Sequence, residues 1–202
     1  MKHSMKKIQK QTPKRKGSPK LNYNNARKQL AEDFNNRCGY CDDSAQIACC
    51  SFHIDHFAPR KFEHLVNDYN NFVYSCPYCN MSKKDKWVSD SADISVIGDV
   101  GFVDPCDDSY NELFERLDNG KIKPLTKLAE YIYLELKLYL KRHEVLYLME
   151  EINTKCDLVE LKIRELQSGG KNTEKLEKIH YELLKYFKDY FSIYQQEWNS
   201  GQ

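Results

Sequence analysis

Three short runs of sequence decide the fold: Cys38-Gly-Tyr-Cys41, His53-Ile-Asp55-His56-Phe-Ala-Pro59 and Cys76-Pro-Tyr-Cys79-Asn80-Met-Ser-Lys83. Two Cys-x-x-Cys pairs enclose an Asp-His dipeptide, and each pair places two thiolates on one turn. Four such thiolates make a closed tetrahedral site that suits structural Zn²⁺. A module of about 50 residues needs a staple of this kind, because its core is too small to be stable alone. We therefore expect Cys38, Cys41, Cys76 and Cys79 to bind zinc; two thioredoxin-like redox pairs are the competing interpretation.

Composition indicates a soluble protein of a reducing compartment. Charged residues make up 30% of the 202 residues, and no apolar run of about 18 residues could span a membrane. The basic N-terminus lacks the apolar core of a secretory signal, so we expect a cytoplasmic location. There, paired cysteines indicate metal or redox chemistry rather than disulfides. Cys106 and Cys156 are interpreted as small buried hydrophobic residues, and Cys49-Cys50 as an alternative ligand pair.

Charge and composition divide the chain into three parts. Residues 1–22 are rich in lysine, contain no acidic residue and are interrupted by proline and glycine, which predicts a disordered basic arm. Such an arm can contact phosphates or serve only solubility. Residues 23–124 are expected to form the zinc-bearing domain, and residues 125–202 a helical hairpin. The predicted class is α+β: a zinc-stapled ββα-metal module with a mainly α-helical C-terminal hairpin.

Periodicity predicts the main elements. Apolar residues at every fourth position predict a helix over 24–36, and residues 47–57 have the propensity of a strand. A loop follows over 58–72, and a short helix is expected to begin around Cys79. One continuous helix is predicted from Thr126 to Gln167, which contain no glycine or proline, and a second over 176–194 after a Gly-Gly turn.

Residues inside the zinc module have the chemistry to hydrolyse a phosphodiester. A neutral imidazole, here His56, serves as a base near neutral pH. Asp55 and Asn80 offer oxygen ligands for Mg²⁺ or Mn²⁺, and Lys83, one helical turn after Asn80, could contact a phosphate. Neighbours in a regular strand face opposite ways, so we expect the chain to bend at His56-Phe57, or the two side chains to flank the phosphate.

The order of these residues resembles the HNH endonuclease family over residues 35–86. The resemblance implies that His56 is the general base and that Asp55 and Asn80 hold the divalent metal. It also implies that Asn71 orders the loop backbone and keeps the base in place, although the adjacent Asn70 leaves this register open by one residue. His53 is additional to the motif and is interpreted as supporting the site rather than binding the metal.

A narrower resemblance concerns residues 56–62, the Cys-Asn-x-x-Lys run and Phe102-Val-Asp104-Pro105. These runs are similar to HNH proteins of bacterial anti-phage systems, in particular the PtuB component of Septu. That resemblance implies a DNA-cleaving defence nuclease regulated by an ABC-type ATPase partner (PtuA-like). Asp104 itself is interpreted as an ordinary turn residue.

The C-terminal hairpin carries more aromatic residues than two helices can bury against each other. They are Tyr131, Tyr133, Tyr139, Tyr147, Tyr181, Tyr186, Tyr190 and Tyr194. We expect this surface to dock the ATPase or a second copy, with packing onto the zinc-bearing domain as the alternative. The alternative for the whole chain is a zinc-stabilised nucleic-acid-binding or adaptor protein without catalysis, in which Asp55 and His56 are incidental.

Overall fold

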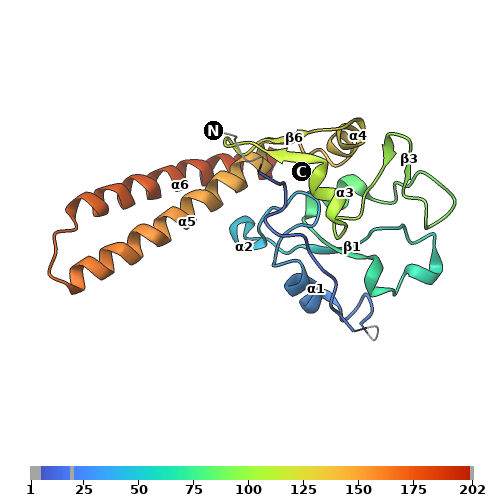
Figure 1. The fold of residues 1–202 in the computed structure, drawn as a ribbon, viewed down its shortest axis with the longest axis horizontal. Helices are drawn as coiled ribbons and strands as arrows, with labels where there is room; N and C mark the ends of the chain where they lie inside the picture. The colour runs from blue at the N-terminus through green and yellow to red at the C-terminus, as the bar shows by residue number, and fades with distance from the viewer. Residues whose placement is uncertain (1–5, 19–20, 201–202) are drawn as a thin grey trace. The chain divides into compact units, whose positions relative to one another are not determined.

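The computed structural model describes residues 6–18 and 21–200, which fall into two compact units, Met1–Leu140 and Lys141–Gln202 (Figure 1). The first unit mixes short strands and helices, and the second consists of two long helices. The predicted α+β class, with a long C-terminal helix pair, is therefore confirmed. The unit boundary follows Leu140, so the first helix after residue 125 belongs to the first unit.

The first unit contains short elements joined by turns. In chain order they are α1 Arg27–Asp33, α2 Ala45–Ala48, β1 His53–His56, η1 Glu63–Leu65, η2 Tyr69–Asn71, β2 Phe72–Ser75, α3 Pro77–Lys83, β3 Val96–Ile97, β4 Val100–Gly101, η3 Asp108–Glu112, β5 Phe114–Arg116, β6 Ile122–Pro124 and α4 Lys127–Glu135. Each of the three antiparallel hairpins, β1-β2, β3-β4 and β5-β6, is a separate two-stranded sheet. Such short hairpins need packing partners, which helices and loops provide.

The hairpin β1-β2 and helix α3 form the predicted ββα unit. His56 is paired with Phe72 and Asp55 with Val73 in the antiparallel register. Phe72 and Val73 are fully buried, so the hairpin is anchored through β2. Cys76 directly follows β2 and caps α3, which fixes how the helix follows the hairpin.

The predicted strand over residues 47–57 begins later than expected. Ser44 caps the short helix α2 by accepting a hydrogen bond from the Ile47 amide at 3.4 Å. Cys49 ends this helix in the left-handed conformation, with φ of 49°. A left-handed residue cannot continue a strand, so β1 is confined to His53–His56.

The prediction of a disordered arm does not hold for residues 6–18, which pack on the first unit; residues 1–5 and 19–20 lie outside the described part of the chain. Ile8 is 2% exposed, and the side-chain amide of Gln9 donates to the carbonyl oxygens of Gly39 and Pro105. Arg15 forms a bidentate ion pair with Asp104 at 2.9 and 3.0 Å. The arm is therefore held in place by a few buried side chains, which its lysine-rich composition does not predict.

The helix predicted from Thr126 to Gln167 is in fact two helices. After α4, the Lys137 residue has φ of 55°, and the Leu138 amide donates to the Tyr133 carbonyl at 2.9 Å. This pattern is a Schellman-type helix end that uses lysine instead of glycine. Leu138 is 2% exposed, and its burial compensates for the unfavourable backbone conformation of Lys137.

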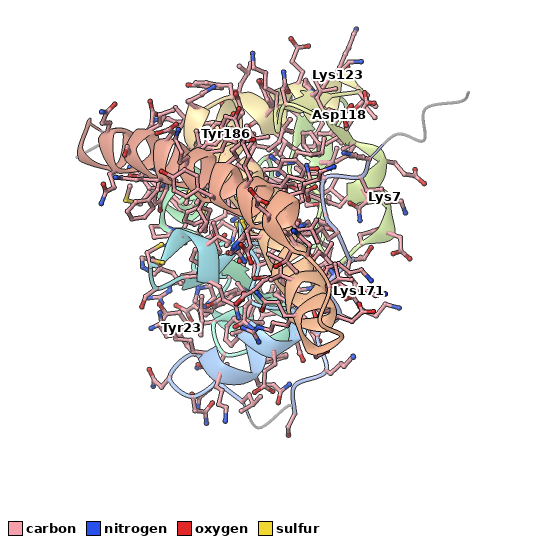
Figure 2. The ribbon with its side chains drawn as sticks, turned by 90° about the vertical axis from the view of Figure 1, so that its left-hand side faces the viewer. Lys7, Tyr23, Asp118, Lys123, Lys171 and Tyr186 are labelled. Atoms are coloured by element: carbon pink, nitrogen blue, oxygen red, sulfur yellow. The ribbon has the colours of Figure 1, made fainter. Side chains whose placement is uncertain are left out.

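The second unit is a pair of packed helices, α5 Lys141–Ser168 and α6 Glu174–Ser200, joined by the predicted Gly-Gly turn. Cys156 and Ile163 are buried one heptad apart on α5. Apolar side chains also face outward: Leu161 is 66% exposed, and Tyr186, which projects from α6, is 59% exposed (Figure 2). None of the described helices is both long and apolar enough to cross a membrane.

Candidate active site

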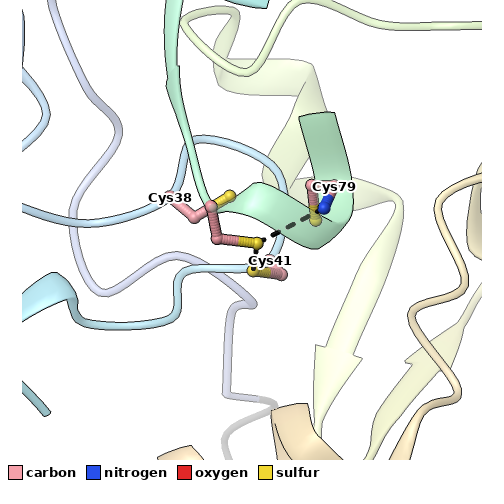
Figure 3. A group of neighbouring side chains, drawn as sticks. Cys38, Cys41 and Cys79 are labelled. Carbon is pink, nitrogen blue, oxygen red and sulfur yellow. Dashed lines mark hydrogen bonds between the residues drawn. The ribbon is translucent and has the colours of Figure 1, made fainter. Parts of the chain in front are cut away.

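The four predicted cysteines converge. Their sulfur atoms all lie within 4.8 Å of one another, and all four residues are buried (Figure 3). The Cys41 and Cys76 sulfurs are 3.8 Å apart. Cys49 is exposed and Cys50 half-buried, and neither belongs to this group. The cysteines that converge are therefore the four that the Cys-x-x-Cys spacing singled out.

Local backbone geometry builds the two sulfur-bearing turns. In the first, the Asp42 amide donates to the Cys38 carbonyl at 2.9 Å, and Asp42 has φ of 63°. In the second, the Cys76 sulfur accepts a hydrogen bond from the Cys79 amide at 3.4 Å, at the N-terminus of α3. A helix N-terminus favours a negatively charged ligand such as a thiolate.

The protonation chemistry of this cluster fits a zinc ion. Burial raises the pKa of the Cys41 and Cys79 thiols well above the ordinary value. Burial also opposes ionisation of Cys38, yet hydrogen bonds from the other three thiols bring its pKa well below that value. One thiolate is thus favoured, and further ionisation in a buried cluster requires a cation. The four-cysteine group therefore suits a structural zinc.

A pocket of about 400 Å³ lies over the β1-α3 side of the first unit. Its lining residues include Tyr23, Asp55, His56, Arg60 and Asn80. Asp55 and His56 thus reach one pocket although they are neighbours in sequence. β1 ends at His56, and the chain bends at Phe57-Ala58, where the Phe57 amide donates to the Asn71 carbonyl at 2.8 Å. This bend lies beside the predicted position.

The two ring nitrogens of His56 have different partners. Nε2 lies 2.9 Å from the Val66 carbonyl oxygen, which can only accept, so Nε2 carries the proton. Nδ1 therefore holds the lone pair, and the Arg60 Nε atom donates to it at 3.4 Å. Burial lowers the pKa of His56, with the charges of Arg60 and Lys83 acting in the same direction. A neutral imidazole with a defined basic nitrogen results.

Asp55 is held by two partners beneath the pocket. Its Oδ2 atom accepts a hydrogen bond of 2.6 Å from the Tyr40 hydroxyl and lies 3.6 Å from the Lys83 ammonium. Burial raises the pKa of Asp55, while Lys83 and Tyr40 oppose that shift. Both contacts fall on Oδ2, so the hydrogen bond and the ion pair hold the same oxygen of the carboxylate. Tyr40 was not predicted, although it stands inside the first cysteine pair.

Lys83 does not occupy the predicted phosphate-contacting position. Its side chain is fully buried, and its ammonium donates to the His56 carbonyl oxygen at 3.0 Å. A group without solvent exposure cannot reach a phosphate in the pocket. The reason is the direction of the side chain, which runs from α3 under β1 to Asp55. Lys83 therefore links α3 to two residues of β1: its ammonium contacts the Asp55 carboxylate and the His56 carbonyl oxygen.

Asn71, rather than Asn70, makes the contacts expected of the loop-ordering residue. Its Oδ1 atom accepts from the Ala58 amide at 2.7 Å, and its Nδ2 atom donates to the Ala58 and Leu65 carbonyls at 2.9 and 3.3 Å. Asn71 is buried, whereas Asn70 is exposed. These bonds fix the loop that carries Pro59 and Arg60 to the end of β1.

Asn80 lies on α3 at the pocket, and its Nδ2 atom is 3.2 Å from the Nδ1 atom of His53. This contact uses the amide nitrogen and directs the amide oxygen elsewhere. His53 is exposed and contacts Asn80 rather than the pocket itself. Asp55 and Asn80 both line the pocket, and each carries an oxygen atom of the kind that a hard divalent cation prefers.

Comparison with known families agrees with this geometry. The family model described as HNH endonuclease matches residues 38–86, which begin at the first cysteine and end just after α3. No curated protein and no solved structure matches the chain. Similarity to this family over residues 38–86 implies hydrolysis of nucleic-acid phosphodiester bonds by this segment. Residues 38–86 are therefore an HNH endonuclease domain that carries a four-cysteine cluster.

Proposed function

We propose that this protein is a metal-dependent DNA endonuclease in which His56 is the general base. The observation that carries the proposal is the hydrogen bond between His56 Nε2 and the Val66 carbonyl, which leaves Nδ1 as the basic nitrogen at a pocket shared with Asp55 and Asn80. Nδ1 takes a proton from the attacking water. The Val66 carbonyl then stabilises the positive charge that the imidazole gains.

The other residues of the site have supporting roles in this proposal. Asp55 and Asn80 would hold Mg²⁺ or Mn²⁺, which when bound neutralises charge on the scissile phosphate. Lys83 and Tyr40 hold the Asp55 carboxylate, and Asn71 holds the loop beside the base. Zinc on the four cysteines holds the domain and takes no part in the chemistry.

A plasmid-nicking assay with Mg²⁺ or Mn²⁺ tests the proposal. His56→Ala should lower the cleavage rate by about 100- to 10,000-fold, the usual contribution of a general base. His64→Ala is the matched control, because His64 is exposed on η1 and lies outside the pocket, and it should cleave like the wild type. Equal nicking by the His56→Ala and wild-type proteins would exclude His56 as the base.

We further propose that the nuclease serves anti-phage defence with an ABC-type ATPase (PtuA-like) bound to its helix pair. The proposal starts from the resemblance of residues 56–62, the Cys-Asn-x-x-Lys run and residues 102–105 to Septu proteins. The observation that supports it is the set of outward apolar side chains on α5 and α6. Purification of the tagged chain from its native host should recover such an ATPase. Leu161→Glu should reduce the recovery and Lys162→Glu should not; equal recovery by both variants would exclude this face of α5.

A further inference from the structure

The imidazole of His56 is enclosed by two aromatic rings. Tyr23 stacks on it with ring centroids 5.2 Å apart and an interplanar angle of 13°. Phe72 meets it edge-on at 5.3 Å and 89°. Phe72 belongs to β2 and is fully buried, whereas Tyr23 precedes α1 and is 36% exposed. Tyr23 therefore reaches the base from outside the HNH match over residues 38–86.

The Tyr23 ring also lies under the guanidinium of Arg60. The Arg60 Cζ atom is 4.6 Å from the Tyr23 ring centroid, while its Nε atom is 3.4 Å from His56 Nδ1. The guanidinium and the imidazole are thus side by side, and both lie against the same tyrosine ring. Tyr23 therefore makes a cation-π contact with Arg60 and stacks on His56 with the same ring.

The hydrogen bond to Val66 does not by itself fix the direction of Nδ1. A single bond at Nε2 holds one corner of the imidazole, and the torsion that rotates a histidine ring has a broad energy minimum. The flat face of Tyr23 restricts this rotation, together with the edge contact of Phe72 and the Arg60 contact at Nδ1. Base catalysis depends on such alignment, because a displacement of about 1 Å can cost a factor of about 100 in rate.

We propose that Tyr23 is a positioning residue that holds the imidazole plane of the base and the guanidinium of Arg60 at the pocket. The cleavage effect rests on the proposed role of His56, whereas the placement of the ring does not. The Tyr23 hydroxyl has no hydrogen-bond partner among the described residues, so the aromatic ring is the part that acts. Tyr23→Phe should therefore keep the imidazole of His56 in place. Tyr23→Leu and Tyr23→Gln, which lack an aromatic ring, should not.

Nuclear magnetic resonance of the zinc-loaded full chain tests the placement without cleavage. The His56 ring protons, assigned with His56→Ala, should show the same ring-current shift in the wild type and in Tyr23→Phe. That shift should disappear in Tyr23→Leu and Tyr23→Gln. Unchanged His56 resonances in a folded Leu or Gln variant, or an equal loss in Tyr23→Phe, would overturn the proposal. Thermal unfolding and zinc content identify the variants that fold.

Cleavage kinetics of the same proteins give the functional readout. Tyr23→Leu should lower kcat by up to about 100-fold while KM stays within about 2-fold, because alignment rather than binding is lost. Tyr23→Phe should retain the wild-type kcat, and Tyr139→Leu controls for loss of an exposed tyrosine elsewhere. A wild-type kcat in folded Tyr23→Leu overturns the positioning role. A wild-type protein that fails to cleave counts against the proposed function alone, because the resonance shifts still decide the placement.

Discussion

At the scale of single residues, the two ring nitrogens of His56 have different partners. His56 donates through Nε2 to a backbone carbonyl and presents Nδ1 to the pocket. The neighbouring cations Arg60 and Lys83 favour the neutral ring, since each opposes a second positive charge. A neutral ring has a free lone pair with which to accept a proton.

The pH dependence of cleavage follows from this environment. Burial, together with Arg60 and Lys83, lowers the pKa of His56 below its ordinary value of 6.5, and the Val66 carbonyl only partly opposes the shift. The base acts when deprotonated, so kcat/KM should fall as the pH falls through the lowered pKa. The midpoint of this acid limb should lie below 6.5.

The Arg60→Ala variant provides the matched comparison for that profile. Removing the guanidinium removes one cause of the lowered pKa, so the acid limb should move to higher pH. Measurement of kcat/KM between about pH 4 and 8 covers the ordinary histidine range. A wild-type midpoint above 6.5 would contradict the neutral-base environment.

At the scale of elements, the loop after β1 is tied to the start of β2 by one side chain. Asn71 bonds to both backbone groups of Ala58 and to the Leu65 carbonyl. Asn71→Ala should lower the free energy of unfolding by about 1–3 kcal/mol, because buried backbone groups lose their partners. Chemical denaturation measures this loss.

Asn70→Ala is the control for that variant, because Asn70 is the adjacent, exposed asparagine. A substitution at an exposed position that makes none of the Asn71 hydrogen bonds should alter the free energy of unfolding by less than about 0.5 kcal/mol. Equal losses from the two variants would show that the tie does not depend on Asn71. The pair also resolves, in solution, the register that the Asn-Asn sequence leaves open.

Element boundaries show where sequence patterns are insufficient. The cysteine spacing predicted which four cysteines converge, because a tetrahedral site tolerates few alternatives. The break after α4 was not predicted, since Lys137 adopts φ of 55° without glycine, and the buried Leu138 compensates for it. The burial of the Lys83 side chain was likewise not predicted, because a long, charged side chain is typical of an exposed residue that contacts phosphate.

At the scale of the whole molecule, a small domain is assembled from segments distant in sequence. The arm over residues 6–18 is joined to it by Arg15, which donates to the Phe72 carbonyl at 2.7 Å and pairs with Asp104. Composition predicted disorder for this arm because it records charge but not the burial of Ile8 or Gln9. With strands of at most four residues, the first unit depends on such cross-connections.

Metal removal should therefore destabilise the first unit more than any single hydrogen bond does. Structural zinc contributes about 10–16 kcal/mol of apparent binding free energy, which is comparable to the whole stability of a domain.

Cys41→Ser should lose zinc and lower Tm sharply, with new proteolytic cleavage inside residues 23–124. Cys49→Ser is the control, because Cys49 is exposed and outside the cluster, and it should match the wild type. If Cys41→Ser kept its full zinc content and the wild-type Tm, the four sulfurs would not bind a zinc ion that stabilises this fold. The two cysteine pairs would then be better interpreted as redox pairs.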